Sequence, residues 1–235
     1  MIIVKGLQFK VKRNWYKFKF IFTVLKMLQE EQLQLLDQLR FGQSFSERKD
    51  ALTSLKALED SGSTKPLDIK TLLNDDDSVT RNYAIGAAGR MKNEELKSKL
   101  INDFAQSFDP ILLISYIEAF ISYDQTDFVI PLADKIKVLR KSPSKKVKQQ
   151  DLEGDFILEQ IIIPCLKYLE KHANKDHAEM IKSFLNDDDI NVRWHALKMI
   201  DQFQIDISEN QLIDIKEKDS SLLNREQASM MLDKK

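Results

Sequence analysis

Two runs of three consecutive aspartates are the residues of this chain that most resemble a site for chemistry. Asp75–Asp77 and Asp187–Asp189 each stand in the sequence Leu-Asn-Asp-Asp-Asp. Clustered carboxylates can bind calcium, but a calcium loop alternates its oxygen ligands, needs a glycine at its bend and ends in a glutamate. Neither run is followed by that pattern. The sequence therefore favours polar turns in which the last aspartate of each run caps a helix.

Other reactive side chains lack the partners that catalysis or metal binding needs. His172 and His177 are five residues apart, whereas two metal ligands on one helix normally stand four apart. Cys165 lies in an apolar helical run, where a buried and inert thiol is expected. The sequence suggests no nucleophile–base pair, phosphate-binding glycine loop or dinucleotide fingerprint. We therefore expect no enzyme activity, no metal and no cofactor.

The first aspartate run belongs to a stretch that the chain repeats. Residues 73–91, LNDDDSVTRNYAIGAAGRM, correspond to residues 185–203, LNDDDINVRWHALKMIDQF, at a shift of 112 residues. Both copies carry an arginine after the aspartates and an alanine three residues after that arginine. Apolar residues follow at helical spacing. Such a long-range repeat predicts a repeat architecture in which each unit is a helix, a polar turn and a capped second helix.

Four further stretches carry parts of this pattern. In each second helix, the position that corresponds to Ala84 and Ala196 is called its anchor. Ser44 and Glu47 read as a capping box, Asp109 precedes a proline at the first helical position, and Asp155 and Ser221 stand before the other two helices. The anchors are Ala51, Ala84, Tyr116, Ile162, Ala196 and Ala228. The steps between them are 33, 32, 46, 34 and 32 residues, so six units fit a period near 33 with one insertion before Ile162.

This pattern resembles the HEAT-repeat family, including the shorter HEAT-like repeats of bacterial proteins. The family's second helix begins Asp-x-x-Val-Arg-x-x-Ala, which is complete at Asp189–Ala196 and, with Thr80 in place of valine, nearly complete at Asp77–Ala84. The resemblance implies an all-α fold, an α-solenoid of the armadillo and HEAT type with about six helical-hairpin repeats. It also implies that the recurring arginines pair with the capping acid of a neighbouring unit; these are Arg48, Arg81, Arg193 and Arg225.

Charge divides the chain into two regions. Residues 1–26 carry seven basic residues and no acid, although the net charge of the whole chain is −1. We expect a basic, aromatic segment at 1–26, either a cap helix or an arm, with a short strand near Phe18–Phe22 as the alternative to a helix. Residues 27–235 should form the solenoid, with a basic loop insertion at 140–150.

The sequence also indicates where in the cell the chain is expected to lie. No clean apolar run reaches the roughly 18 residues that cross a bilayer, so we expect no transmembrane span. The basic, aromatic segment at 1–26 could still lie on an anionic membrane surface as a peripheral contact. A single cysteine permits no disulfide within the chain, which favours a reducing compartment such as the cytoplasm.

A partner is expected to bind along the concave face of the solenoid. Residues one or two before each anchor, and two after it, should face outward there. The predicted partner-binding residues are Lys49, Asp50, Asn82, Tyr83, Glu118, Trp194, His195 and Lys198, and Ser115 belongs with them. Trp194 would be the main anchor of the interface, with packing against the neighbouring unit as the alternative. The basic loop offers a second contact through Lys141, Lys145, Lys146 and Lys148.

The favoured function is therefore a non-catalytic scaffold or adaptor that binds another protein. One alternative is a HEAT-like protein that binds nucleic acid, which would need a continuous basic stripe. Asp50 and Glu118 interrupt such a stripe, so nucleic acid is the weaker prediction. The chain also resembles the HEAT-like subunits of bilin lyases, which handle a chromophore on a partner protein. That alternative needs an aromatic and acidic pocket, and the sequence does not identify one.

Overall fold

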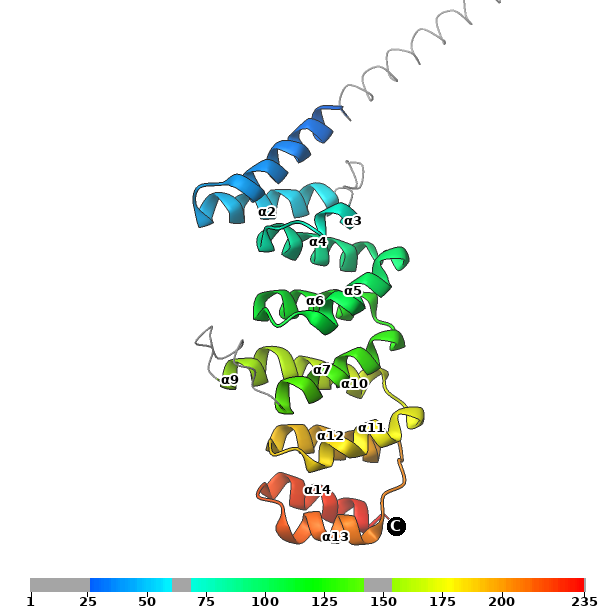
Figure 1. Ribbon diagram of the computed structural model, residues 1–235. Coiled ribbons are helices and arrows are strands. Elements are labelled where there is room, and N and C mark those ends of the chain that lie inside the picture. The colour runs from blue at the N-terminus through cyan, green and yellow to red at the C-terminus, as the bar shows by residue number, and fades with distance from the viewer. Residues whose placement is uncertain (1–25, 61–68, 142–153, 235) are drawn as a thin grey trace, which may run out of the picture. The chain divides into compact units, whose positions relative to one another are not determined.

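The computed structural model describes residues 26–60, 69–141 and 154–234, and the regular elements in these ranges are all helices (Figure 1). The predicted all-α class is therefore confirmed. Most of the predicted segment 1–26 and most of the basic insertion, including Lys145, Lys146 and Lys148, lie outside the described residues. The chain divides into an N-terminal unit, Met1–Ala87, and a C-terminal unit, Ala88–Lys235, and each is described by itself.

The N-terminal unit contains two pairs of helical segments. Residues 26–41 are helical and are followed by α2 (Phe45–Asp60); α3 (Ile69–Leu72) is followed by α4 (Ser78–Met91), whose last turn belongs to the C-terminal unit. The predicted capping box forms at the start of α2. Ser44 Oγ accepts the Glu47 N–H at 3.2 Å, and the Glu47 carboxylate accepts the Ser44 N–H at 3.3 Å.

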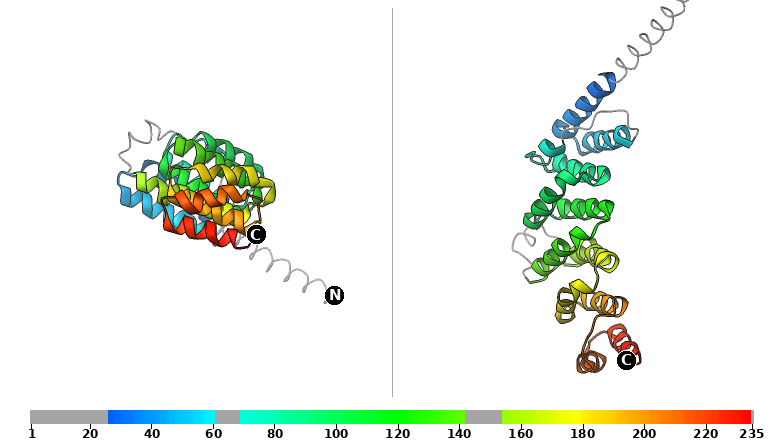
Figure 2. Two further views of the ribbon diagram at one scale, coloured as in Figure 1. Left: turned by 90° about the horizontal axis from the view of Figure 1, so that it is seen from below. Right: turned by 90° about the vertical axis from the view of Figure 1, so that its right-hand side faces the viewer.

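The C-terminal unit contains four helix pairs. Its elements are α5 (Glu94–Gln106), α6 (Pro110–Tyr123), η1 (Thr126–Phe128), α7 (Val129–Lys141), α9 (Gly154–Ile157), η2 (Leu158–Ile162), α10 (Ile163–His172), η3 (Lys175–His177), α11 (Ala178–Ser183), η4 (Phe184–Asn186), α12 (Ile190–Gln202), α13 (Glu209–Lys218) and α14 (Leu222–Leu232). The second helices α6, α10, α12 and α14 contact one another in chain order. The right-hand view of Figure 2 shows them in one column of this unit and the first helices in another.

The predicted anchors lie in the core. All six have 4% or less of their surface exposed, as expected for residues that face neighbouring helices. Aromatic rings fill the space between α5, α6 and η1, where Phe120 stacks on Phe128 at 4.2 Å and meets Phe104 edge-on at 5.2 Å. Gly89, at the end of α4, lets this helix approach α6 closely, since a Cβ there would lie 2.6 Å from Ala119 Cα. Small and aromatic residues therefore set the helix spacing in this region.

The two aspartate runs form the same turn. Asp77 accepts the Thr80 N–H at 2.7 Å, and Asp189 accepts the Asn191 N–H at 2.8 Å, so both cap helices as predicted. The first aspartate of each run accepts the N–H of the third at 2.9 Å. Asp155 does not fit the scheme, because helix α9 already includes Gly154 and Asp155 is not the residue before the helix.

The recurring arginines hold these turns together. Arg81 Nη1 donates to the carbonyls of Asp75 and Asp76 at 2.6 and 2.9 Å, and Arg193 Nη1 does the same to Asp187 and Asp188 at 2.8 and 2.9 Å. One guanidinium thus satisfies two turn carbonyls that the helices leave free. The repeated sequence therefore encodes a repeated local structure.

The predicted pairing with a neighbouring unit's acid occurs at two arginines. Arg48 Nη2 lies 2.6 Å from Asp77 Oδ1, which is the capping acid of the next helix pair. Arg193 makes two bonds to Asp219, at 2.7 and 3.0 Å. Asp219 stands two residues before the cap Ser221, so the prediction was wrong about which acid is used there. Arg225 donates to a carbonyl of its own turn, that of Asp219, at 2.7 Å.

Two arginines of the first helices reinforce the same turns. Arg40 lies 2.6 Å from Asp75, and Arg140 lies 2.9 Å from Asp187. The repeat did not reveal these pairs, because both arginines lie outside the repeated stretch.

Pro164 lies inside a long helical stretch and is preceded by an irregular turn. Residues 154–172 are helical throughout, and the turn before the proline, Leu158–Ile162, is a π-helix. The Ile163 N–H bonds to the Leu158 carbonyl, five residues back. Because proline has no N–H to donate and its ring crowds the preceding turn, a wider turn accommodates it.

Candidate partner-binding face

The surface opposite the anchors of α6, α10, α12 and α14 is the candidate site, and we call it the outer face. A residue two before or two after an anchor lies about 160° around the helix from it, because each residue turns the helix by about 100°. Residues five or six before an anchor, and five or nine after it, lie on the same side. The outer face consists of Ile111, Ile114, Glu118, Ile121, Phe156, Gln160, Pro164, Lys167, Lys171, Ile190, Trp194, Lys198, Asp201, Leu222, Leu223, Glu226, Met230 and Asp233.

Three residues that were predicted to face outward are buried. Tyr83, Ser115 and His195 expose 1%, 6% and 8% of their surface. Each stands one residue before an anchor and so lies only about 100° around the helix from it. That direction is the flank of the helix, which packs against neighbouring elements. The outward orientation predicted for these three residues is therefore wrong, whereas Asp50, in the same position before Ala51, is exposed.

The other predicted residues reach the surface, but they lie in different units. Lys49 and Asp50 are exposed and Asn82 is half-buried, and all three belong to the N-terminal unit. In the C-terminal unit Glu118 is exposed, while Trp194 and Lys198 are half-buried. Of the predicted basic loop, only Lys141, the last residue of α7, lies within a described helix. The structure therefore brings Glu118, Trp194 and Lys198 onto one face.

Glu170 organises the centre of the outer face. His195 Nδ1 lies 2.6 Å from the Glu170 carboxylate, and Lys198 Nζ lies 3.0 Å from it. Gln202 Nε2 donates to the Glu170 carbonyl at 3.0 Å. The buried His195 therefore joins α10 to α12 and holds the position of Lys198. Sequence reasoning missed Glu170, since it lies 25 residues from His195 and no local pattern links them.

A second carboxylate, Asp124, joins α6 to α10. Its Oδ1 lies 2.5 Å from Lys171 Nζ and 2.9 Å from His172 Nε2, the latter without hydrogen-bond geometry. The hydrogen bond from Lys171 lowers the pKa of Asp124 below its ordinary value. Beside this pair the Tyr168 hydroxyl donates to the Gln125 carbonyl at 2.7 Å and accepts the Gln125 N–H at 3.0 Å. Such bonds between successive second helices fix the register of the outer face.

Apolar side chains are numerous on the outer face. Ile111, Ile121, Phe156, Ile190, Leu222, Leu223 and Met230 expose between 37% and 66% of their surface. They lie on α6, α9, α12 and α14 of the C-terminal unit, and none of them lies on α10. A soluble monomer seldom exposes a large contiguous apolar surface unless another molecule covers it. The outer face thus has the composition of an interface.

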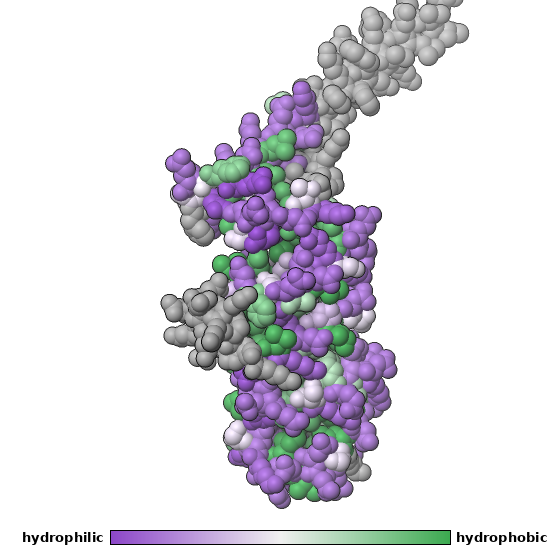
Figure 3. Space-filling model, viewed as in Figure 1, coloured by the Kyte–Doolittle hydropathy of each residue, from purple (hydrophilic) through white to green (hydrophobic). Residues whose placement is uncertain are grey.

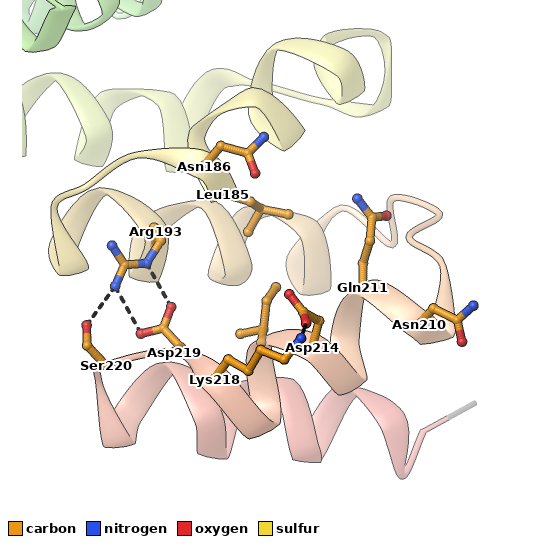
Figure 4. Close-up of a pocket in the computed structure, with 10 residues that line it drawn as sticks. Leu185, Asn186, Arg193, Asn210, Gln211, Asp214, Lys218, Asp219 and Ser220 are labelled. Atoms are coloured by element: carbon orange, nitrogen blue, oxygen red, sulfur yellow. Dashed lines mark hydrogen bonds and ion pairs between the residues drawn. The ribbon is translucent and has the colours of Figure 1, made fainter.

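A groove between η4 and α13 is a competing site. It has a volume of about 650 Å³, and Figure 4 shows Arg193, Asp219 and Ser220 at one end, with Asp214 and Lys218 along α13. Both of its charge pairs, Arg193–Asp219 and Lys218–Asp214, are already formed within the chain. Figure 3, in which one face of the molecule is coloured by residue hydropathy, shows mostly hydrophilic residues with smaller hydrophobic areas between them. The charged groups of the groove are therefore less available to a ligand than the exposed apolar side chains of the outer face.

A metal cluster and a membrane-spanning helix are two other features that could point to a function. In the described ranges no three metal-ligating side chains come together. Among the helices of these same residues, none has the length and apolar character needed to span a bilayer.

Comparison with known proteins does not assign the chain to a family. The chain matches no protein-family model and no curated protein.

Proposed function

We propose that this chain is a HEAT-like α-solenoid of six helix pairs that acts as a non-catalytic protein-binding scaffold or adaptor, with its partner on the outer face of the C-terminal unit. In this arrangement the outer face is the concave face. Each of the six predicted repeats contains two described helical segments, and the six anchors are buried. The contacts between successive second helices support the repeat architecture as well.

The exposed apolar side chains on α6, α9, α12 and α14 are the observation that carries the proposed function. Hydrogen bonds and ion pairs at Glu170 and Asp124 hold these helices in register, so the surface is preformed. A preformed surface loses little conformational freedom when it binds. Half-buried Trp194 lies within it, and tryptophan is enriched among the residues that dominate binding energy.

Charge on the outer face favours protein over nucleic acid. Glu118 and Glu226 stand among the same residues as Lys167 and Lys198. Nucleic-acid binding requires a basic surface that follows the phosphate backbone. The mixed signs on this face disfavour that alternative.

Affinity capture from the source cell's lysate, with identification by mass spectrometry, tests the proposal. Wild type is compared with an Ile111→Glu, Ile190→Glu double variant of the outer face. The control is Ile213→Glu, which alters an exposed isoleucine on α13. Circular dichroism checks that all three chains are equally helical.

We expect wild type and the Ile213→Glu control to retain a common protein that the double variant loses. Retention of the same protein by all three chains would place the interface elsewhere. Recovery of nucleic acid alone would contradict the scaffold function.

A further inference from the structure

The dimensions of the outer face indicate what kind of segment would cover it. Packed helices lie about 8–10 Å apart, so the three steps from α6 to α14 span about 24–30 Å. Along α6 the apolar residues run from Ile111 to Ile121, a distance of about 15 Å at 1.5 Å per residue. An extended chain is too narrow to cover that width. An α-helix, with a diameter of about 10–12 Å, covers most of it.

Charges on the outer face follow a definite order. On the central helices α10 and α12, Lys171 pairs with Asp124 and Lys198 pairs with Glu170, whereas Lys167 takes part in no ion pair among the described residues. The centre of the face therefore keeps an excess of positive charge.

The ends of the face are acidic. Glu118 of α6, Glu226 of α14 and Asp233, directly after α14, are exposed and take part in none of the ion pairs among the described residues. Asp201 of α12 is neutralised by Lys234, 2.7 Å away. The face is thus negative at α6, positive at α10, balanced at α12, where Lys198 pairs with Glu170, and negative at α14.

This charge order argues against a second copy of the chain as the occupant. If two outer faces met about a two-fold axis, α6 would face either α6 or α14 of the other copy, and α10 would face α10 or α12. Both arrangements place acid against acid and lysine against lysine. Like charges opposed across an interface cost binding energy.

We infer that the partner presents an amphipathic α-helix of about 16–20 residues, with acidic residues at its centre and basic residues towards its ends. Its apolar stripe covers the isoleucines and leucines of the outer face. The length follows from the span of about 24–30 Å at 1.5 Å per residue. Its central acids meet Lys167, Lys171 and Lys198, and its ends meet Glu118 and Glu226. The inference rests on the proposed function and specifies its partner.

Three synthetic 18-residue peptides test this inference. The first carries a leucine stripe at helical spacing, glutamates at its centre and lysines at both ends. The second has the same composition with the two charge blocks exchanged. The third is the first with its leucines replaced by serine. Fluorescence anisotropy of end-labelled peptides measures each Kd with the full chain at about 50 mM and about 300 mM salt.

The first peptide should bind roughly tenfold more tightly than the second at low salt, and the third should not bind. The preference should shrink at high salt, because ions screen exposed charges. Lys167→Glu should weaken the first peptide up to about fivefold, the upper range for an exposed pair, and strengthen the second. Lys216→Glu, an exposed lysine of α13, is the matched control and should change neither Kd.

The remaining outcomes contradict the inference in separable ways. If the first two peptides bind equally and Ile111→Glu abolishes both, the face binds helices but the charge assignment is wrong. Tighter binding of the second peptide, or binding of the serine peptide, also overturns the assignment. If no peptide binds, the helical partner is wrong, while the lysate experiment decides the scaffold function independently.

Discussion

Arg193 and Asp219 show how single residues join successive helix pairs. Their side chains are 13% and 5% exposed and make two hydrogen bonds. Burial alone would raise the pKa of Asp219, but hydrogen bonds from Arg193, the Ser221 N–H and Asn224 lower it below the ordinary 3.8. A carboxyl whose pKa is lower in the folded chain stabilises the fold above pH 3.8. That contribution is lost as the pH falls through the folded pKa.

Asp219→Asn should therefore destabilise the chain by about 2–4 kcal/mol at pH 7, because it leaves a partly buried guanidinium unpaired. Urea denaturation at pH 7 and at pH 2.5 measures the effect, and the difference from wild type should be smaller at the lower pH. Asp188→Asn, at an exposed aspartate of the neighbouring turn, should change stability by less than about 0.5 kcal/mol. Equal effects of the two substitutions would show that the ion pair contributes little.

Lys135 is a buried lysine in the middle of α7, and its ammonium group lies at the C-terminal end of α5. Its Nζ donates to the carbonyls of Ala105 and Ser107 at 2.7 and 3.0 Å and lies over the Phe108 ring at 4.7 Å. Burial lowers its pKa from 10.5 to about 8. Between these values the unfolded chain binds more protons than the folded chain, so this lysine makes stability rise with pH across that window.

Lys135→Met should remove this contribution. The stability of wild type relative to the variant should increase by roughly 2–4 kcal/mol between pH 8 and pH 10.5, since one pKa unit corresponds to about 1.4 kcal/mol. Denaturant titrations at half-unit intervals of pH measure it. A constant difference across the window would mean that Lys135 keeps an ordinary pKa.

At the scale of elements, close approach of α4 to α6 depends on Gly89. A glycine inside an exposed helix normally destabilises it, and replacement by alanine gains about 0.5–1 kcal/mol. Here the added Cβ would lie 2.6 Å from Ala119 Cα, which is backbone and cannot rotate away.

Gly89→Ala should therefore lower the stability of the chain instead of raising it. The expected loss is about 1–3 kcal/mol, the usual range for overpacking. Thermal and chemical unfolding measure the change. A gain in stability would show that the two helices can separate without loss.

At the scale of the whole molecule, a repeat protein is stabilised mainly by contacts between neighbouring units. Leu212 of α13, in the last helix pair, is fully buried. Leu212→Ala should cost about 2–5 kcal/mol locally. Hydrogen exchange should then accelerate in α13 and α14 and stay unchanged in α5 and α6. Uniform acceleration through the C-terminal unit would indicate one cooperative core instead of a chain of repeats.

The sequence by itself determined the local structure. Ser44, Asp77, Asp109, Asp189 and Ser221 cap helices as predicted, and the anchors are buried. These features depend on residues within one or two helical turns of each other, so the order of residue types is enough to specify them. Periodicity also identified the side of each second helix that faces the core.

Only the tertiary structure decided which residues form the outer face and what holds it. Tyr83 and His195 are buried because a helix flank meets elements whose position the local pattern does not contain. Glu170 reaches His195 from 25 residues away, and Asp124 reaches Lys171 from 47 residues away. Such pairs depend on how helices stack, and stacking follows from the summed packing of side chains far apart in the sequence. The candidate interface could therefore be seen only once the helices were in place.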